Sequence, residues 1–248
     1  MVKLETRDNI ALLTLNNPDK RNMLTPDVCW QIAELVQQVE ADDSIRALIV
    51  TGAGKAFCAG GRLDDLQADE AVLRSIYNGF LGIANCSIPT IAAVNGAAVG
   101  AGFNLALSCD VRIVTEQAKF IPRFFEIGLH PGGGNSWMLR QLANWDTAAG
   151  MLLFSQTLTG QQAVEKGLAW QCVPNDKLIE TAFALTDTIK HLPRELLVKT
   201  KQSLRQASFE PSHATMVDVE TEKQKWSLEQ PFAQEAIAEL KAKISKQN

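Results

Sequence analysis

Hydrophobic runs that end in glycine-rich turns occur twice in the chain and predict buried strands. Residues 90–94 follow a proline and are too few for a helix, so they predict a buried strand that ends at Asn95 and Gly96. Residues 47–51 form a similar run, which leads into a second glycine-rich segment at 52–61. Because helical segments follow both loops, the pattern predicts an α/β fold.

The remaining pattern predicts a hairpin in the first fifteen residues and helices elsewhere. Thr25 and Pro26 are the residue types preferred at the N-cap and first position of a helix. Helical spacing of apolar residues recurs at 146–154, 161–166, 176–190, 193–206 and 231–245, with an expected connector at 168–173. We therefore predict an α/β core in residues 1–170 and a helical region in residues 171–248.

The turn after residues 90–94 has the features of an anion-stabilising site. Gly100 and Gly102 allow close approach of the backbone, and residues 103–109 have the composition of a helix. The first N–H groups of a helix lack intrahelical partners and could hold a developing negative charge. An ordinary strand-to-helix turn is the alternative, and segment 52–61 could supply a second donor.

Composition and charge narrow the class of partner. The 248 residues are 46% hydrophobic, which allows a large core, and the net charge of −4 with scattered basic residues argues against nucleic-acid binding. The five cysteines lack CxxC spacing, so we expect reduced thiols in a cytoplasmic protein and no metal site. We expect no membrane span and no targeting segment, because apolar runs are short and strand-like alternation begins at once.

Four motifs carry a resemblance to a known family. They are NPDKRNML at 17–24, TGAGKAFCAGGRL at 51–63, IPTIAAVNGAAVGAGFNLALSCDVRI at 88–113 and GLHPGGG at 128–134. In these motifs the chain resembles the crotonase, or enoyl-CoA hydratase/isomerase, superfamily. The resemblance implies an α/β fold with a ββα spiral core and a helical C-terminal trimerisation region, assembled as a homotrimer or dimer of trimers. It also implies an acyl-CoA ligand and no separate cofactor, because coenzyme A is part of the substrate.

The resemblance assigns roles to individual residues. The N–H groups of Gly61 and Ala101 correspond to the family's oxyanion-hole donors. Lys20, Arg21 and Met23 would flank the nucleotide or pantetheine of coenzyme A. The other implied substrate-binding residues are Ala59, Gly60, Arg62 and Leu63. The segment that follows should border the acyl pocket, with expected apolar lining residues Leu66, Leu73, Ile76, Tyr77 and Phe80.

Both positions at which hydratases of the family carry a glutamate hold other residues here. Counting from the GAG turn places Asn104 at the first position, and the second falls on Phe124. Asn104 cannot exchange a proton at neutral pH, and Phe124 only fills space. Glu126, two residues further, is expected to point elsewhere. His130 is the remaining acid or base candidate, with a structural role as its alternative.

Two classes of function remain open. The first is an enzyme of the enoyl-CoA hydratase/isomerase type, with His130 as an atypical acid or base and Asn104 orienting a substrate or water. Standard hydration is unsupported there, which leaves isomerisation or other enolate chemistry. The second is an acyl-CoA binding protein without turnover. A dinucleotide-binding site is a poor fit, because its third glycine is missing, and a serine hydrolase is a poor fit, because the chain has no GxSxG turn. Asn135 and Ser136 are interpreted as helix-capping residues.

Overall fold

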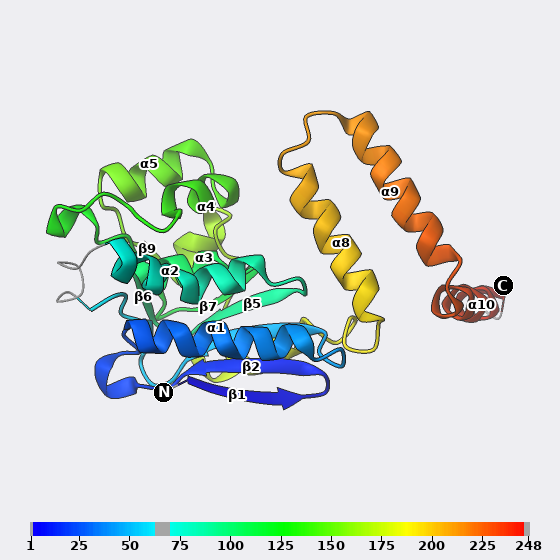
Figure 1. Ribbon diagram of the computed structural model, residues 1–248, viewed down its shortest axis with the longest axis horizontal. Coiled ribbons are helices and arrows are strands. Elements are labelled where there is room, and N and C mark those ends of the chain that lie inside the picture. The colour runs from blue at the N-terminus through cyan, green and yellow to red at the C-terminus, as the bar shows by residue number, and fades with distance from the viewer. Residues whose placement is uncertain (1, 63–69, 246–248) are drawn as a thin grey trace. The chain divides into compact units, whose positions relative to one another are not determined.

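The computed structural model describes residues 2–62 and 70–245 and comprises two compact units (Figure 1). The first unit extends to His191, and the second begins at Leu192. This division falls after the expected boundary at residue 170, because strand β10 (Gln171–Val173) pairs with the main sheet. The sequence predicts only a connector there, since three residues are too few to display the strand period.

Two sheets form the framework of the first unit. The larger has the strand order β1-β2-β3-β5-β7-β10, with bounds β1 Val2–Arg7, β2 Ile10–Leu15, β3 Ala47–Gly52, β5 Thr90–Val94 and β7 Val111–Thr115. Only its β1–β2 pair is antiparallel. This pair confirms the predicted hairpin, and Asp8 and Asn9 both have positive φ at its turn. The smaller sheet contains β4 Ala56–Cys58, β6 Ala97–Val99, β8 Lys119–Ile121 and β9 Leu158–Thr159.

The two sheets are built by a repeated unit of two strands and a helix. Strands β3, β5 and β7 pair in parallel in the larger sheet, and the strand after each, β4, β6 and β8, pairs in parallel in the smaller one. Helices α2 (Glu70–Asn85) and α3 (Ala101–Leu107) complete the first two repeats. This topology confirms the expected ββα spiral. It also places both glycine-rich turns at the end of the smaller sheet.

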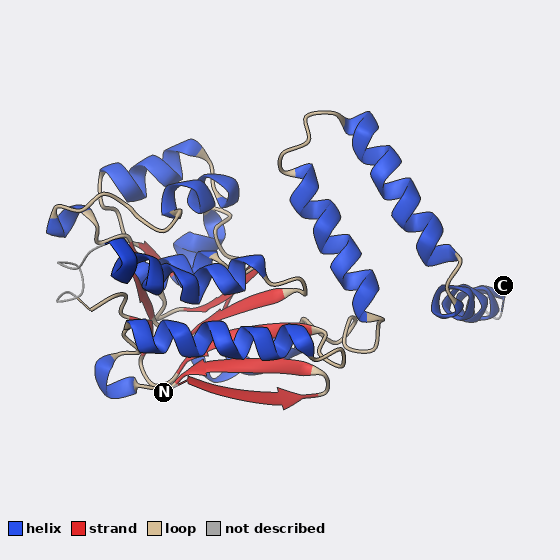
Figure 2. Ribbon diagram, in the orientation of Figure 1, coloured by secondary structure: helices blue, strands red, loops and turns tan. Residues whose placement is uncertain are grey.

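Helices of the first unit, such as α1, lie over its strands, as Figure 2 shows with helices in blue and strands in red. Thr25 caps helix α1 (Pro26–Ala41) as predicted, because its side chain accepts a hydrogen bond from the Val28 N–H at 3.3 Å. Helices α1 and α2 pack against each other. The remaining elements of this unit are α4 Asn135–Leu142, α5 Trp145–Leu153, α6 Gly160–Glu165, α7 Leu178–Ala184 and the 3-10 turns Pro18–Lys20, Phe125–Ile127 and Asn175–Lys177.

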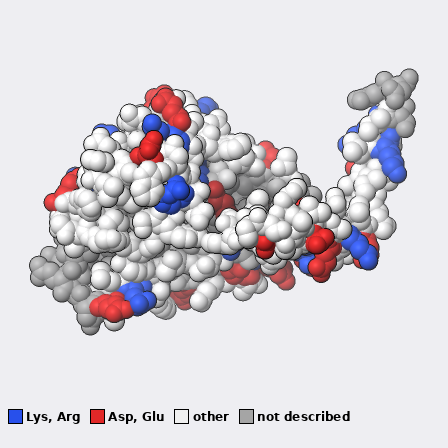
Figure 3. All heavy atoms as spheres, turned by 90° about the horizontal axis from the view of Figure 1, so that it is seen from above, with Lys and Arg blue, Asp and Glu red and all other residues white. Residues whose placement is uncertain are grey.

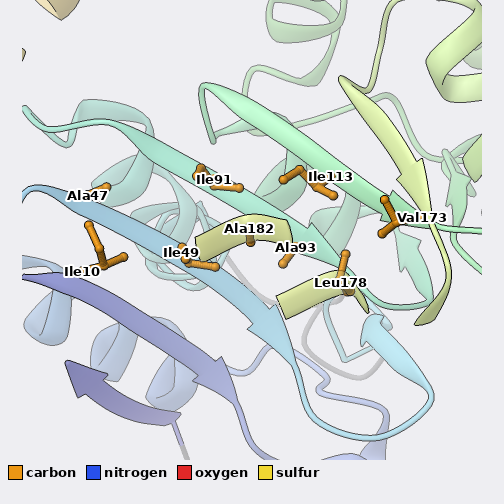
Figure 4. Close-up of a cluster of buried hydrophobic side chains, with 9 residues drawn as sticks. All are labelled: Ile10, Ala47, Ile49, Ile91, Ala93, Ile113, Val173, Leu178 and Ala182. Carbon is orange, nitrogen blue, oxygen red and sulfur yellow. The ribbon is translucent and has the colours of Figure 1, made fainter. Parts of the chain in front are cut away.

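Helix α7 packs against the larger sheet and forms an apolar core with it (Figure 4). Leu178 and Ala182 of this helix meet a row of strand side chains. The row consists of Ile10, Ala47, Ile49, Ile91, Ala93, Ile113 and Val173. All are buried, so removal of water from this face stabilises the sheet that carries the loops.

The second unit is helical, as the sequence predicts. It contains α8 (Arg194–Ala207), α9 (His213–Leu228) and α10 (Pro231–Ser245). The Lys199 ammonium lies 4.7 Å from the centre of the Trp226 ring, which couples α8 to α9. None of the helices in the described ranges is long and apolar enough to cross a membrane. On the face shown in Figure 3, basic and acidic side chains are interspersed.

Candidate active site

A cavity of about 320 Å³ in the first unit brings together residues from both glycine-rich loops. Its walls are otherwise largely apolar and come from helix α2 and the segment around residues 123–132. The expected site residues that line it are Ala59, Gly60, Gly61, Ala101, Asn104, Phe124 and His130. Residues Leu73, Ile76 and Tyr77 also line it, as expected, whereas Phe80 lies fully buried in the core.

The first loop directs the Gly61 N–H away from its neighbouring strand segment. Leu24 donates its N–H to the Gly60 carbonyl at 2.8 Å and accepts one from Arg62 at 3.2 Å. In extended backbone, successive peptide groups point to opposite sides. The Gly61 N–H therefore points away from Leu24, and none of the described residues accepts a hydrogen bond from it.

The second loop leaves the Ala101 N–H at the start of a helix. Ala101 is the first residue of α3, where an N–H has no acceptor within the helix. Gly60 has φ of +89°, and a Cβ built there would lie 2.5 Å from the Val99 carbonyl oxygen and 3.5 Å from the Ala101 nitrogen. The two loops thus touch through their backbones, which places both N–H groups at the same end of the cavity.

Asn104 is held by two hydrogen bonds at the cavity wall. Its Nδ2 donates to the Gly132 carbonyl at 2.9 Å, and its Oδ1 accepts from Asn135 Nδ2 at 2.5 Å. Asn104 and Asn135 are 1% and 0% exposed. The interpretation of Asn135 as a capping residue is wrong: Gly134 is the N-cap of α4, no side chain caps it, and Asn135 points into the core. This amide pair ties α3 to the glycine-rich turn at 132–134.

The remaining candidates differ in chemistry. Phe124 is half-buried and lines the cavity, where its ring adds apolar surface. The exposed His130 ring also lines it, with Nδ1 2.8 Å from the Pro131 carbonyl oxygen. Because a carbonyl oxygen only accepts, a hydrogen bond at this contact requires the tautomer with its proton on Nδ1, in which Nε2 is the acceptor nitrogen. Glu126 pairs with Arg123 at 3.1 Å, and both side chains are about half exposed.

The residues implied to flank coenzyme A lie outside the cavity wall. Lys20 and Arg21 are exposed, Met23 is half-buried, Arg62 is exposed, and Leu63 and Leu66 fall outside the described residues. The turn that carries Lys20, Arg21 and Met23 is nevertheless hydrogen-bonded to the first glycine-rich loop. Ala59 donates its N–H to the Arg21 carbonyl at 2.9 Å. Among the described residues, no three His, Cys, Asp or Glu side chains lie together in a way that could hold a metal ion.

Sequence reasoning missed Asn22, which holds this turn. Asn22 is 2% exposed, and its Nδ2 donates to the carbonyls of Ala53 and Ala56 at 2.9 and 2.8 Å. Its Oδ1 accepts the Asn17 N–H at 2.9 Å. The only sequence signal is an asparagine after two basic residues in a turn, and an asparagine in a turn is ordinary.

Comparison with known proteins places this geometry in a family. The family model described as Enoyl-CoA hydratase/isomerase matches residues 5–243. A probable enoyl-CoA hydratase of Mycobacterium tuberculosis (strain ATCC 25618 / H37Rv) is 43% identical over 209 residues, which are 82% of this chain and 81% of the relative. A 1,2-epoxyphenylacetyl-CoA isomerase of Escherichia coli (strain K12) is 35% identical, over 96% of this chain and 94% of the relative.

Solved structures agree. The crystal structure of an enoyl-CoA hydratase from Polaromonas sp. JS666 superimposes with a TM-score of 0.90 at 29% identity, covering 98% of this chain and 97% of that one. The sequence matches and the shared spiral extend over nearly the whole chain, and the glycine-rich loops lie within the matched region. The protein therefore belongs to the enoyl-CoA hydratase/isomerase family, within the crotonase superfamily.

Proposed function

We propose that the protein binds acyl-CoA thioesters, with the thioester carbonyl oxygen held by the N–H groups of Gly61 and Ala101. The observation that carries this proposal is that two backbone donors with no acceptor among the described residues lie at one end of an apolar cavity. A ligand oxygen placed between them would satisfy both. The acyl group would then extend along the apolar wall.

Two such donors favour chemistry that passes through an enolate. Removal of a proton from the α-carbon of a thioester, or addition at its β-carbon, places negative charge on the carbonyl oxygen. Fixed donors in a site with little water stabilise that charge without reorganisation, and each contributes on the order of 3 kcal/mol to lowering the barrier. Relatives are named both hydratase and isomerase, so their names alone do not select the reaction.

The position of coenzyme A follows from the turn near residue 20. We place the nucleotide or pantetheine beside Lys20, Arg21 and Met23, because this turn is bonded to the first glycine-rich loop. The two basic side chains are exposed, so they could reach a phosphate group. Coenzyme A would enter as part of the substrate.

The cavity wall argues against ordinary hydration. Asn104 has its amide engaged by Gly132 and Asn135, and Phe124 offers no proton. His130, through Nε2, is the base that we propose for isomerisation or related enolate chemistry. General acid–base groups typically contribute about 10²–10⁴ in rate each. Without the two glutamates, hydration should therefore fall close to the uncatalysed rate.

Activity assays test this assignment. Thioester absorbance should show hydration of crotonyl-CoA near background, and slow but measurable conversion of a 3-enoyl-CoA. His130→Ala should lower the latter by about 10²–10⁴. His213→Ala, in the second unit, is the matched control and should change nothing. Hydration as fast as in ordinary hydratases would refute the expectation that the missing glutamates abolish hydration. Activity unaffected by His130→Ala would remove that residue from the mechanism.

A non-catalytic acyl-CoA binding protein is the second candidate. The observation that favours it is that no described residue lining the cavity is an aspartate or glutamate. Calorimetry with saturated and unsaturated acyl-CoAs separates the two candidates when combined with the assays. Binding without conversion of any enoyl-CoA selects this candidate, whereas absence of binding across chain lengths defeats both.

We also propose that the chain assembles as a homotrimer or a dimer of trimers. Large apolar side chains are exposed in both units, among them Trp145 at 67%, Phe154 at 71%, Leu204 at 69% and Phe209 at 65%. Contiguous apolar surface is usually covered by another protein surface, so we expect these side chains to contribute to subunit contacts. Sedimentation at micromolar concentration should show a trimer or hexamer, and a monomer would contradict the proposal.

A further inference from the structure

Helix α2 spans the cavity from the oxyanion end to the turn at residues 132–134. At one end, a Cβ built on Gly61 would lie 3.8 Å from Ile76 Cδ1. At the other, a Cβ built on Gly132 would lie 2.5 Å from the Tyr77 hydroxyl oxygen. Helix α2 thus places Ile76 beside the Gly61 donor and the Tyr77 hydroxyl beside Gly132, and all four residues line the cavity.

The ring of Tyr77 packs against Phe80, and Tyr77 lines the cavity. Tyr77 and Phe80 have ring centres 5.7 Å apart at an interplanar angle of 49°. The glycine at position 132 leaves room for the hydroxyl to lie against the backbone. None of the described residues forms a hydrogen bond with this hydroxyl, although Tyr77 is half-buried and lines the cavity. A phenol in such a place normally has a partner.

The other polar side chains in the wall are already occupied or placed elsewhere. The Asn104 amide is bonded to Gly132 and Asn135, and Arg123 is paired with Glu126. The remaining wall is apolar apart from His130. A ligand group that contacts Tyr77 meets a neutral hydroxyl, which suits a hydroxyl or carbonyl oxygen better than a carboxylate.

We propose that Tyr77 determines specificity by donating a hydrogen bond to an oxygen atom on the acyl group. The preferred ligands are acyl-CoAs whose chain carries a neutral hydroxyl or carbonyl oxygen beyond the thioester. This inference rests on the proposed binding of acyl-CoA in the cavity. It assigns Tyr77 a polar role, whereas the sequence predicts only an apolar lining.

Calorimetric titration with a set of matched ligands tests the proposal. Hexanoyl-CoA is compared with 3-, 4- and 5-hydroxyhexanoyl-CoA, which move one hydroxyl along the same chain. One of the hydroxylated ligands should bind about threefold to tenfold more tightly than hexanoyl-CoA, as expected for one additional hydrogen bond. Tyr77→Phe should bring the ratio of the affinities for the hydroxylated ligand and for hexanoyl-CoA close to one. The affinity for hexanoyl-CoA itself should remain nearly unchanged.

Two further variants sharpen the interpretation. Leu73→Ala removes an apolar lining residue of the same helix and should weaken all ligands without changing the ratio. Gly132→Ala places a methyl group against the Tyr77 hydroxyl and should reduce the ratio. A ratio near one in the wild type, or a ratio retained in Tyr77→Phe, overturns the role of Tyr77. Failure of every ligand to bind the wild type would instead defeat the proposed function.

Discussion

Ala101→Pro is expected to lower enolate-forming activity by about 10²–10³, the loss seen when one oxyanion donor is removed. Proline has no N–H, so the substitution deletes the donor itself. Ala101 is the first residue of α3, the helix position that best tolerates proline. The fold should therefore survive, and the loss should reflect the missing donor.

The matched control is Ala101→Gly, which retains the N–H and removes only a methyl group. Turnover of a 3-enoyl-CoA should remain near the wild-type value in this variant. If the chain binds without turnover, the enolate absorbance of bound acetoacetyl-CoA provides the same test. The pKa of that ligand should rise by about two units in Ala101→Pro relative to wild type, because about 3 kcal/mol of enolate stabilisation is lost. Equal behaviour of the two variants would exclude Ala101 as a donor.

Local signals in the sequence predict much of the fold. Thr25 and Pro26 mark the start of α1, and helical spacing predicts α8 and α10 close to their observed bounds. Helix α9 is not among the predicted helices. The smaller sheet is not predicted, because β4, β6 and β8 have only three residues each. Strands β4 and β6 also lie inside segments that are interpreted as glycine-rich turns. Pairing between distant segments, rather than local pattern, makes these segments strands.

The site shows the same division between local and distant causes. Glycine-rich turns after buried strands indicate where the two loops lie, because glycine lets the backbone approach closely. The resemblance to the family, rather than the turns alone, selects Gly61 and Ala101 as the donors. The roles of Asn104 and Asn135 are not predictable, since these residues are 31 positions apart and only the fold brings their amides together. From the sequence, Asn104 is expected to orient a substrate or a water molecule. In the structure, its amide is hydrogen-bonded to Gly132 and Asn135.

Asn104→Leu should therefore act mainly on stability and on the shape of the cavity wall. Leucine has the same branching at Cγ, although it is larger, and it neither donates to the Gly132 carbonyl nor accepts from Asn135 Nδ2. Asn135 is 0% exposed, so its amide would be left buried without that acceptor. A buried polar group that loses its partner costs about 1–3 kcal/mol, and here two groups are affected. We expect the free energy of unfolding to fall by roughly 2–4 kcal/mol, measured by urea denaturation.

The control for this last prediction is Asn78→Leu, the same substitution at an exposed position of α2. It should change the free energy of unfolding by no more than about 0.5 kcal/mol, as surface substitutions usually do. Asn104→Asp keeps one acceptor oxygen for Asn135 but cannot donate to Gly132 when ionised, so it should also destabilise the chain. Equal stability of Asn104→Leu and Asn78→Leu would show that the amide pair does not hold the turn at 132–134. A clear difference between them would identify Asn104 as the residue that fixes this turn, and with it the part of the cavity wall on which His130 lies.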